Sequence, residues 1–285
     1  MRNNEERFGT NMSRQDATTP QVLQQSQQEN NPAPLSFIVP TELVSLPSGG
    51  KFYPAHHPLH GKDTIEIKQM TAKEEDILTS KTLIKKGVAL DKLIQSLVVD
   101  KSINTDTLTI EDRSAILVSA RISAYGNDYT TNVICPSCDQ KSKFKFDLLE
   151  QVSKEADPPQ DVEYNPDGTF NLVLPVTKWK VKCRVLNGYD EKAMVKAGEN
   201  KTSNTSDSLL LQQLRATVIE IQGVNDPKLV NAALEAMPAR DSKHLRYTYE
   251  KVAVPINLTK TFNCSNCDNM SLVEVPLSAD FFWFK

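Results

Sequence analysis

The chain has 285 residues, enough for one or two domains with buried cores, and carries 33 Lys and Arg against 36 Asp and Glu. Proteins that bind nucleic acid usually carry a basic surplus, so this balance argues against nucleic acid as a partner. No apolar run approaches the roughly 18 residues of a membrane helix, so we expect no membrane partner either. The first residues lack a secretory signal, and we therefore expect a reducing compartment, where CxxC pairs favour metal over disulfides.

The first 35 residues are rich in Asn, Gln, Ser and Thr and poor in apolar residues. Such a composition cannot bury enough apolar surface to offset the entropy lost on ordering. We predict a disordered arm over 1–35, which is either a flexible tail or a segment that folds on a partner. Order is expected to begin near Leu35.

Three further parts are predicted along the chain. They are an N-terminal α+β part at 36–150 with the first CxxC hairpin, a linker or long loop at 151–168, and a C-terminal α+β part at 169–285 with the second CxxC hairpin and an aromatic tail. The stretch 36–285 can also form a single domain.

Residues 46–54, with the sequence LPSGGKFYP, predict a sharp turn. Two adjacent glycines permit a tight reversal, and the flanking prolines favour extended backbone. Phe52 and Tyr53 supply an aromatic plug for this turn. The segment has neither the glycine spacing nor the following helix of a phosphate-binding loop.

Three histidines follow this turn within five positions, at His56, His57 and His60, and suggest a metal site. Pro58 prevents the helix that would place His56 and His60 on one face, and no Glu lies between them as a zinc-protease motif requires. We interpret them as structural or exposed loop residues. His244 is interpreted as a surface residue in a helical stretch.

Local signals predict one strand and three helices before the first CxxC segment. Thr71 and Glu74 form a capping box, while Thr109 and Gly126 delimit the strongest helix. The predicted strand covers 64–68, and the predicted helices cover 71–79, 90–99 and 109–126.

Two CxxC segments, CPSC at 135–138 and CSNC at 264–267, are each followed by Asp. Each lies between two alternating runs that predict strands, at 129–134 and 143–148 and at 257–262 and 270–276. Two hairpins with CxxC at their tips form a weak internal repeat. Two residues between thiols let both sulfurs reach one ion at about 2.3 Å.

We therefore predict one zinc-ribbon-like tetrathiolate site whose ligands are Cys135, Cys138, Cys264 and Cys267. The expected cofactor is zinc in a structural role, because four thiolates close the coordination shell and leave no position for water. The alternative is two turns without metal. The 125 residues between the segments make a long insertion for a zinc ribbon.

The stretch between the CxxC segments predicts a β-hairpin and then a helical region. The hairpin strands cover 170–174 and 178–185, and alternation places Cys183 inward as a buried structural thiol, without a partner for catalysis. The helical segments are expected near 190–197, 207–222, 227–236 and 241–252. After the second CxxC hairpin, residues 281–284 (FFWF) either fill a groove on this chain or dock on another chain, and we favour docking.

Three of these features resemble the baseplate hub subunits of T-even-type bacteriophages. They are the 46–54 turn, the CxxC hairpin after a helical segment, and the closing aromatics at 281–284. The resemblance covers about residues 40–285 and leaves the arm outside. It implies a non-enzymatic structural or assembly protein of a contractile tail, acting in baseplate hub assembly as a hub component or as a chaperone for hub or tape-measure proteins.

The implied partners are other tail, baseplate hub or tape-measure proteins, and an oligomer is possible. The implied location is the host cytoplasm during assembly, and also the baseplate of the virion tail if the protein stays in the particle and does not act only as a chaperone. The family supplies no catalytic residues for this chain.

Two functions of other classes stay open. A zinc-ribbon adaptor for nucleic acid or a transcription partner predicts salt-sensitive binding to DNA or RNA, against which the charge balance argues. A metal-dependent hydrolase built on His56, His57 and His60 predicts that replacing them removes the metal.

Overall fold

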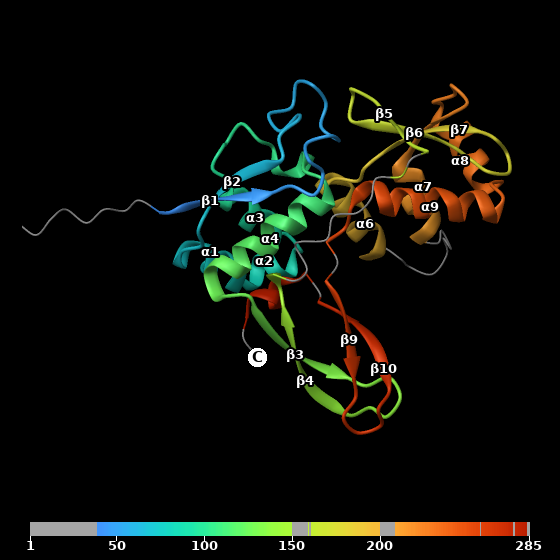
Figure 1. Cartoon of the computed structure of the whole chain (residues 1–285). Helices are drawn as coiled ribbons and strands as arrows, with labels where there is room; N and C mark the ends of the chain where they lie inside the picture. Colours follow the sequence, from blue (N-terminus) through green and yellow to red (C-terminus); the bar gives the residue numbers. More distant parts are fainter. Residues whose placement is uncertain are drawn as a thin grey trace, which may run out of the picture. The chain divides into compact units, whose positions relative to one another are not determined.

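The structure is a computed structural model that describes residues 39–149, 159, 161–199, 209–256, 258–275 and 277–283. The predicted arm at 1–35 and the expected start of order at Leu35 lie outside these residues. By their contacts, residues Val39–Lys285 group into one compact unit. Helices and small antiparallel sheets alternate along it, which confirms the predicted α+β class (Figure 1). No helix in the described part is long and apolar enough to span a membrane.

The first elements are a β-hairpin and a group of helices. They are β1 (Thr41–Ser45), β2 (Thr64–Lys68), α1 (Ala72–Thr79), α2 (Lys81–Lys85), α3 (Ala89–Leu97), η1 (Thr105–Thr107) and α4 (Ile110–Tyr125). Strands β1 and β2 pair antiparallel, with Thr41 opposite Lys68 and Ser45 opposite Thr64. The predicted strand at 64–68 and the three helices are present, whereas β1 and α2 were not predicted.

The capping box at the start of α1 connects three elements. Thr71 accepts from the Lys73 backbone, and the buried Glu74 carboxylate accepts from the Thr71 backbone N–H at 3.0 Å. Glu74 also accepts from Lys68 of β2 at 2.7 Å and from Ser96 of α3 at 2.6 Å. Burial opposes ionisation of this carboxyl group, but the hydrogen bonds outweigh it and lower its pKa to about 2. Glu74 therefore joins α1, α3 and β2 as a carboxylate.

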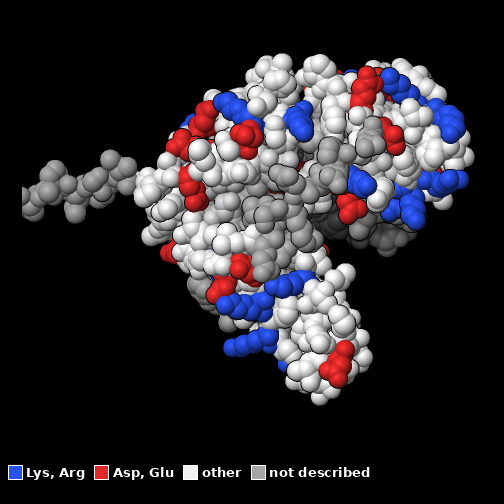
Figure 2. Space-filling model, in the orientation of Figure 1, with Lys and Arg blue, Asp and Glu red and all other residues white. Residues whose placement is uncertain are grey.

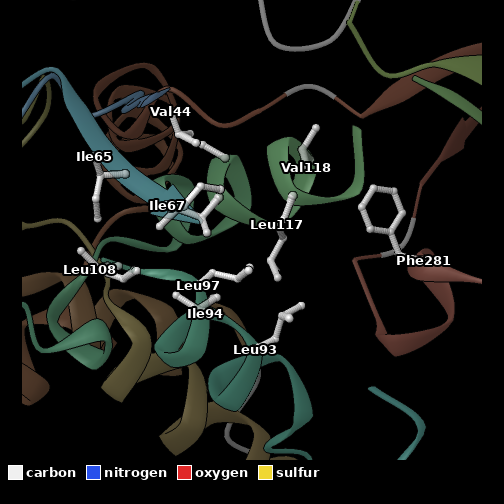
Figure 3. Packing of buried hydrophobic residues seen from close by; sticks show 14 of the residues in the cluster. Val44, Ile65, Ile67, Leu93, Ile94, Leu97, Leu108, Leu117, Val118 and Phe281 are labelled. Carbon is white, nitrogen blue, oxygen red and sulfur yellow. The ribbon is translucent and has the colours of Figure 1, made fainter. Parts of the chain in front are cut away.

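A first hydrophobic cluster lies between the β1–β2 hairpin and helices α3 and α4 (Figure 3). Its labelled members in Figure 3 are Val44, Ile65, Ile67, Leu93, Ile94, Leu97, Leu108, Leu117, Val118 and Phe281. Each fully buried aliphatic side chain stabilises the fold by about 1.5–3 kcal/mol. In this set, Leu93, Ile94 and Leu97 come from α3, and Leu117 and Val118 come from α4.

A second hydrophobic cluster lies between a four-stranded antiparallel sheet and the later helices. The sheet has the order β5-β6-β7-β8, and its strands are β5 (Glu163–Tyr164), β6 (Thr169–Val173), β7 (Lys180–Arg184) and β8 (Val218–Ile221). The helices are α6 (Gly188–Glu199), α7 (Leu209–Thr217), α8 (Pro227–Glu235) and α9 (Ala239–Ala253). The β6–β7 hairpin confirms the predicted hairpin, and Cys183 is fully buried on its inner face.

One predicted helix ends early. The helix expected at 207–222 stops at Thr217, and Val218–Ile221 forms β8 on the edge of β7. The β-branched residues Val218, Ile219 and Ile221 favour a strand, and Val218 and Ile221 bury their side chains against the sheet. Pairing with β7 therefore outweighs the helical pattern at this point.

Two further hairpins carry the CxxC segments and lie side by side in Figure 1. Their strands are β3 (Asp128–Ile134), β4 (Lys141–Asp147), β9 (Thr259–Asn263) and β10 (Met270–Glu274). A short helix, η2 (Ala279–Phe282), follows β10.

The closing aromatic residues pack on this chain, which corrects the preference for docking on another chain. Phe281 is 1% exposed and Phe282 is 0% exposed, and both belong to the first hydrophobic cluster. The Phe281 carbonyl accepts from the Arg121 guanidinium of α4 at 3.2 Å. Filling the core removes more apolar surface from water than exposure for a partner would allow. Phe284 lies outside the described residues.

Candidate metal centre

The four cysteines of the two CxxC segments lie together, and the hairpin strands explain how. In β3–β4, Ile134 pairs with Lys141, so Cys135 and Cys138 fall in the turn at the tip. In β9–β10, Asn263 pairs with Met270 and places Cys264 and Cys267 in the same way. The two tips meet, so ligands from distant parts of the sequence face one another.

The two tips have the same backbone hydrogen bonds. At the first tip, the Cys135 N–H donates to Gln140 and the Asp139 N–H donates to Cys135, both at 3.0 Å. At the second tip, the Cys264 N–H donates to Asn269 at 3.0 Å and the Asp268 N–H donates to Cys264 at 2.9 Å.

The Asp after each CxxC adopts the left-handed backbone, with φ of 54° at Asp139 and 53° at Asp268. Asp tolerates this conformation better than most residues. The repeated CxxC-Asp sequence is therefore also a repeated structure.

The sulfur positions fit a tetrahedral ion. The Cys135 and Cys267 sulfurs are 3.6 Å apart, and the Cys138 and Cys264 sulfurs are 3.7 Å apart. All four sulfurs lie within 4.8 Å of one another. A tetrahedral ion with metal–sulfur bonds of about 2.3 Å requires sulfur–sulfur distances of about 3.8 Å. The four cysteines can therefore hold a metal ion with little rearrangement.

A small hydrophobic cluster supports the site from the hairpin stems. It contains Val133, Phe262 and the fully buried Cys135 and Cys264. Phe144 of β4 contacts the Phe262 ring edge to face, with ring centres 5.5 Å apart. Cys267 is exposed, so one side of the site faces solvent. These aromatic contacts hold the hairpins together beneath the sulfurs.

The electrostatics of the four thiols favour a cation among them. A hydrogen bond from the Asn266 amide lowers the pKa of Cys138 to about 6. The Asn269 backbone lowers the pKa of Cys267, but the neighbouring sulfurs, first that of Cys138, outweigh it and raise this pKa to about 12. One thiolate thus opposes the ionisation of the next, and a bound cation would remove that opposition.

The histidines after the 46–54 turn do not converge on a metal site. His57 Nε2 contacts Thr107 Oγ1 at 2.9 Å, and its Nδ1 accepts from the Leu59 backbone at 3.1 Å. His60 Nδ1 contacts the Tyr53 carbonyl at 2.6 Å. In the described ranges, the four cysteines are the one group of three or more His, Cys, Asp or Glu side chains arranged for a metal. This arrangement fits the interpretation of His57 and His60 as loop residues with structural contacts.

The 46–54 turn is joined to α4 by a buried carboxylate that the sequence did not indicate. Asp112 accepts from the Ser48 N–H at 3.0 Å, from the Ser48 hydroxyl at 2.6 Å and from the Tyr53 hydroxyl at 2.5 Å. Gly50 has φ of +71°, and a Cβ there would lie 2.4 Å from the Lys62 backbone. Only glycine fits this close approach. Asp112 lies in the first turn of α4, and its partners Tyr53 and Ser48, 59 and 64 positions away, gave no local signal.

The remaining cysteine has no place in the site. Cys183 is fully buried in the second hydrophobic cluster, and burial raises the pKa of its thiol well above the usual range. A thiol held neutral in this way is a poor nucleophile and a poor metal ligand.

Comparison with known proteins gives the family. The family model for the T4 bacteriophage base plate protein matches residues 39–283. The chain belongs to this family. A search of the curated proteins and a search of the solved structures found no match.

Membership of the base plate family makes the chain a phage baseplate structural protein, in agreement with the resemblance seen in the sequence. The match covers the 46–54 turn, both CxxC hairpins and the buried aromatics of η2. The metal-compatible cysteine site is thus part of this family member's fold, and its two cysteine pairs come before and after the sequence segment 170–253 that supplies the buried members of the second hydrophobic cluster.

Proposed function

We propose that this baseplate protein acts without catalysis in building the hub of a contractile tail, as a hub component or as a chaperone for hub or tape-measure proteins. The observation that carries the proposal is the base plate family match over residues 39–283. Its partners on this view are other baseplate hub or tape-measure proteins, and it works in the host cytoplasm before or while it enters the tail. An oligomer is compatible with this role.

We propose that Cys135, Cys138, Cys264 and Cys267 bind one structural zinc ion. The soft donor set and the near-tetrahedral sulfur spacing support zinc over the hard cations, which prefer oxygen. Four thiolates leave no open position for water or substrate, so the ion would supply folding free energy rather than chemistry. The ion would join the β3–β4 hairpin to the β9–β10 hairpin.

The charge distribution supports protein partners over nucleic acid. Basic and acidic side chains are intermixed on the face drawn in Figure 2. The whole chain has a formal net charge of −3. Phosphate backbones are usually bound by a continuous basic face.

The test is to recover the tagged protein from infected cells and to identify the proteins that come with it. Hub or tape-measure proteins should be enriched over the same tagged chain expressed with capsid genes only. A phage that lacks the gene should yield defective tails, and the wild-type chain should restore them. Complete infectious tails from the deletion phage would refute an assembly role, as would a chain that enriches no tail protein.

The terminal aromatics are not a clean probe of partner contact. Removal of Phe281 and Phe282 would open the first hydrophobic cluster, so defective tails would report unfolding. The position of the gene is a better independent check, since tail genes on both sides would support the class.

A further inference from the structure

A groove of about 630 Å³ opens where the first strand, α1 and α3 come together. Four of the residues that line it are lysines from four different segments, namely Lys68, Lys73, Lys92 and Lys101, and none of the described lining residues is acidic. Lys68 ends β2, Lys73 lies in the first turn of α1, Lys92 lies on α3, and Lys101 follows α3. A groove of this size holds a few residues of a peptide or a small ligand.

Two of these lysines have structural partners. Lys68 pairs with the buried Glu74 carboxylate at 2.7 Å. Lys101 donates to the carbonyls of Gln95 at 3.0 Å and Ser96 at 3.4 Å at the end of α3. Both ammonium groups thus have a role in holding the walls of the groove.

The other two lysines carry charge that the described residues do not balance. Lys73 and Lys92 are exposed, and no carboxylate in the described ranges pairs with either of them. The one contact shown for Lys92 is a neutral hydrogen bond to Gln95 at 3.1 Å. Burial, then the charges of Lys68 and Lys73, lower the pKa of Lys101, in keeping with an excess of positive charge here. The groove therefore attracts an anionic ligand.

The residues that line the groove beside the lysines indicate which kind of anion fits it. Val39 and Val99 supply apolar surface between the lysines, which a free phosphate cannot use, whereas Val98 is buried in the first hydrophobic cluster. Among the described residues, no aromatic side chain lines the groove, so this part of the chain offers nucleic-acid bases no surface on which to stack. A peptide with both carboxylates and apolar side chains matches both kinds of wall.

We propose that this groove binds an acidic segment of a partner protein, with its carboxylates at Lys73 and Lys92 and its apolar side chains against Val39 and Val99. The proposal rests on the proposed function, in which the chain associates with other baseplate proteins. It adds the place of contact and the chemistry of the partner.

The experiment measures binding of a labelled peptide of alternating Glu and Val to the full chain by fluorescence anisotropy at two salt concentrations. The test variant is Lys73→Glu with Lys92→Glu. The matched control is Lys81→Glu with Lys85→Glu on the neighbouring helix α2, where both lysines are exposed and outside the groove. A milder variant, Lys73→Gln with Lys92→Gln, serves if the reversed charges disturb folding, which circular dichroism would detect.

We expect the Glu–Val peptide to bind the wild-type chain and to bind the groove variant at least about tenfold more weakly, with the control close to wild type. The same peptide with Gln for Glu should not bind. No binding to the wild-type chain, or an equal loss in the control, would overturn the proposal. Displacement of the peptide by excess inorganic phosphate or by single-stranded DNA would assign the groove to another anion and overturn it as well.

Recovery of tail proteins separates this proposal from the proposed function. If the wild-type chain and the groove variant recover the same tail proteins in equal amounts, the proposed role of the groove is refuted and the assembly role is not. A wild-type chain that recovers none refutes the assembly role, whatever the peptide does.

Discussion

Cys138 and Cys264 bring their sulfur atoms to 3.7 Å from each other across 126 positions of sequence. The Cys135 and Cys267 sulfurs form the second close pair at 3.6 Å. A contact between such distant residues depends on both hairpins having formed and met, so the site reports on the folding of these two hairpins.

Replacing Cys135 or Cys264 by Ser should remove the metal. Each change leaves three thiolates, and we expect the purified protein to fall from about one zinc ion per chain to near zero, with a lower melting temperature. Metal content by mass spectrometry after dialysis checks this. Cys183→Ala is the matched control. Cys183 lies in the second hydrophobic cluster, away from the four cysteines, so this substitution should leave the metal in place.

The same measurement tests the hydrolase alternative. Replacing His56, His57 and His60 by Ala should leave the zinc content unchanged. Loss of zinc from the histidine variant but not from Cys135→Ser would contradict the cysteine site.

Asp112→Ala should destabilise the protein by about 3 kcal/mol or more. The change leaves the Ser48 backbone, the Ser48 hydroxyl and the Tyr53 hydroxyl without their buried acceptor. Urea denaturation followed by circular dichroism measures the loss. Asp100→Ala is the control, because the side chain of Asp100 is exposed and accepts hydrogen bonds from nearby Ser102, and an equal loss there would refute the role of Asp112.

Glu111→Gln should remove a dependence of stability on pH. Burial raises the pKa of Glu111 to about 8 from 4.5, the nearby charge of Asp112 adds to this, and Glu111 Oε2 has no hydrogen-bond partner in the described part of the chain. The folded state keeps this proton longer than the unfolded state. The stabilisation is therefore complete below pH 4.5 and is lost as pH rises to about 8.

The expected slope between these two pH values is about 1.4 kcal/mol per pH unit for this one group. Urea denaturation of both proteins across this range compares the two slopes. The free energy of unfolding of the variant should rise relative to that of the wild type as pH rises. If the two free energies change in parallel with pH, Glu111 is not buried in its neutral form.

Phe281→Ala should destabilise the protein by about 3–5 kcal/mol, because it opens a cavity in the first hydrophobic cluster. Thermal unfolding shows the effect as a lower melting temperature. Leu272→Ala removes an apolar side chain of β10 that is 75% exposed and should change little. If Phe281→Ala is as stable as the wild type, the aromatic residues are free to dock elsewhere.

Structures that depend on interactions between residues close in sequence were predicted correctly. The capping box of Thr71 and Glu74, the cap at Thr109 and the stop at Gly126 all hold, because each depends on hydrogen bonds to the adjacent helical turn. The CxxC hairpins were predictable for the same reason, since alternating strands on either side of a short turn define the register.

Features that depend on distant partners were not predictable. Val218–Ile221 continues a helical apolar pattern, and although its β-branched residues favour a strand, pairing with the edge of β7 decides its structure. The Asp112 bonds to Ser48 and Tyr53, and the burial of Phe281 beside Tyr129, join residues far apart in sequence. Their residue types gave no sign of which distant partner each would meet.

Because the four cysteines are divided between two hairpins far apart in sequence, one pair is synthesised well before the other during translation. A ribosome that has passed Cys138 has made only half of the ligand set, and the other half follows when Cys264 and Cys267 are synthesised. Until then the first pair is an open dithiol, available to oxidants and to competing metals. Coordination of an ion by all four cysteines would therefore require the second hairpin, and a truncated product that stops before Cys264 lacks two of the four thiols.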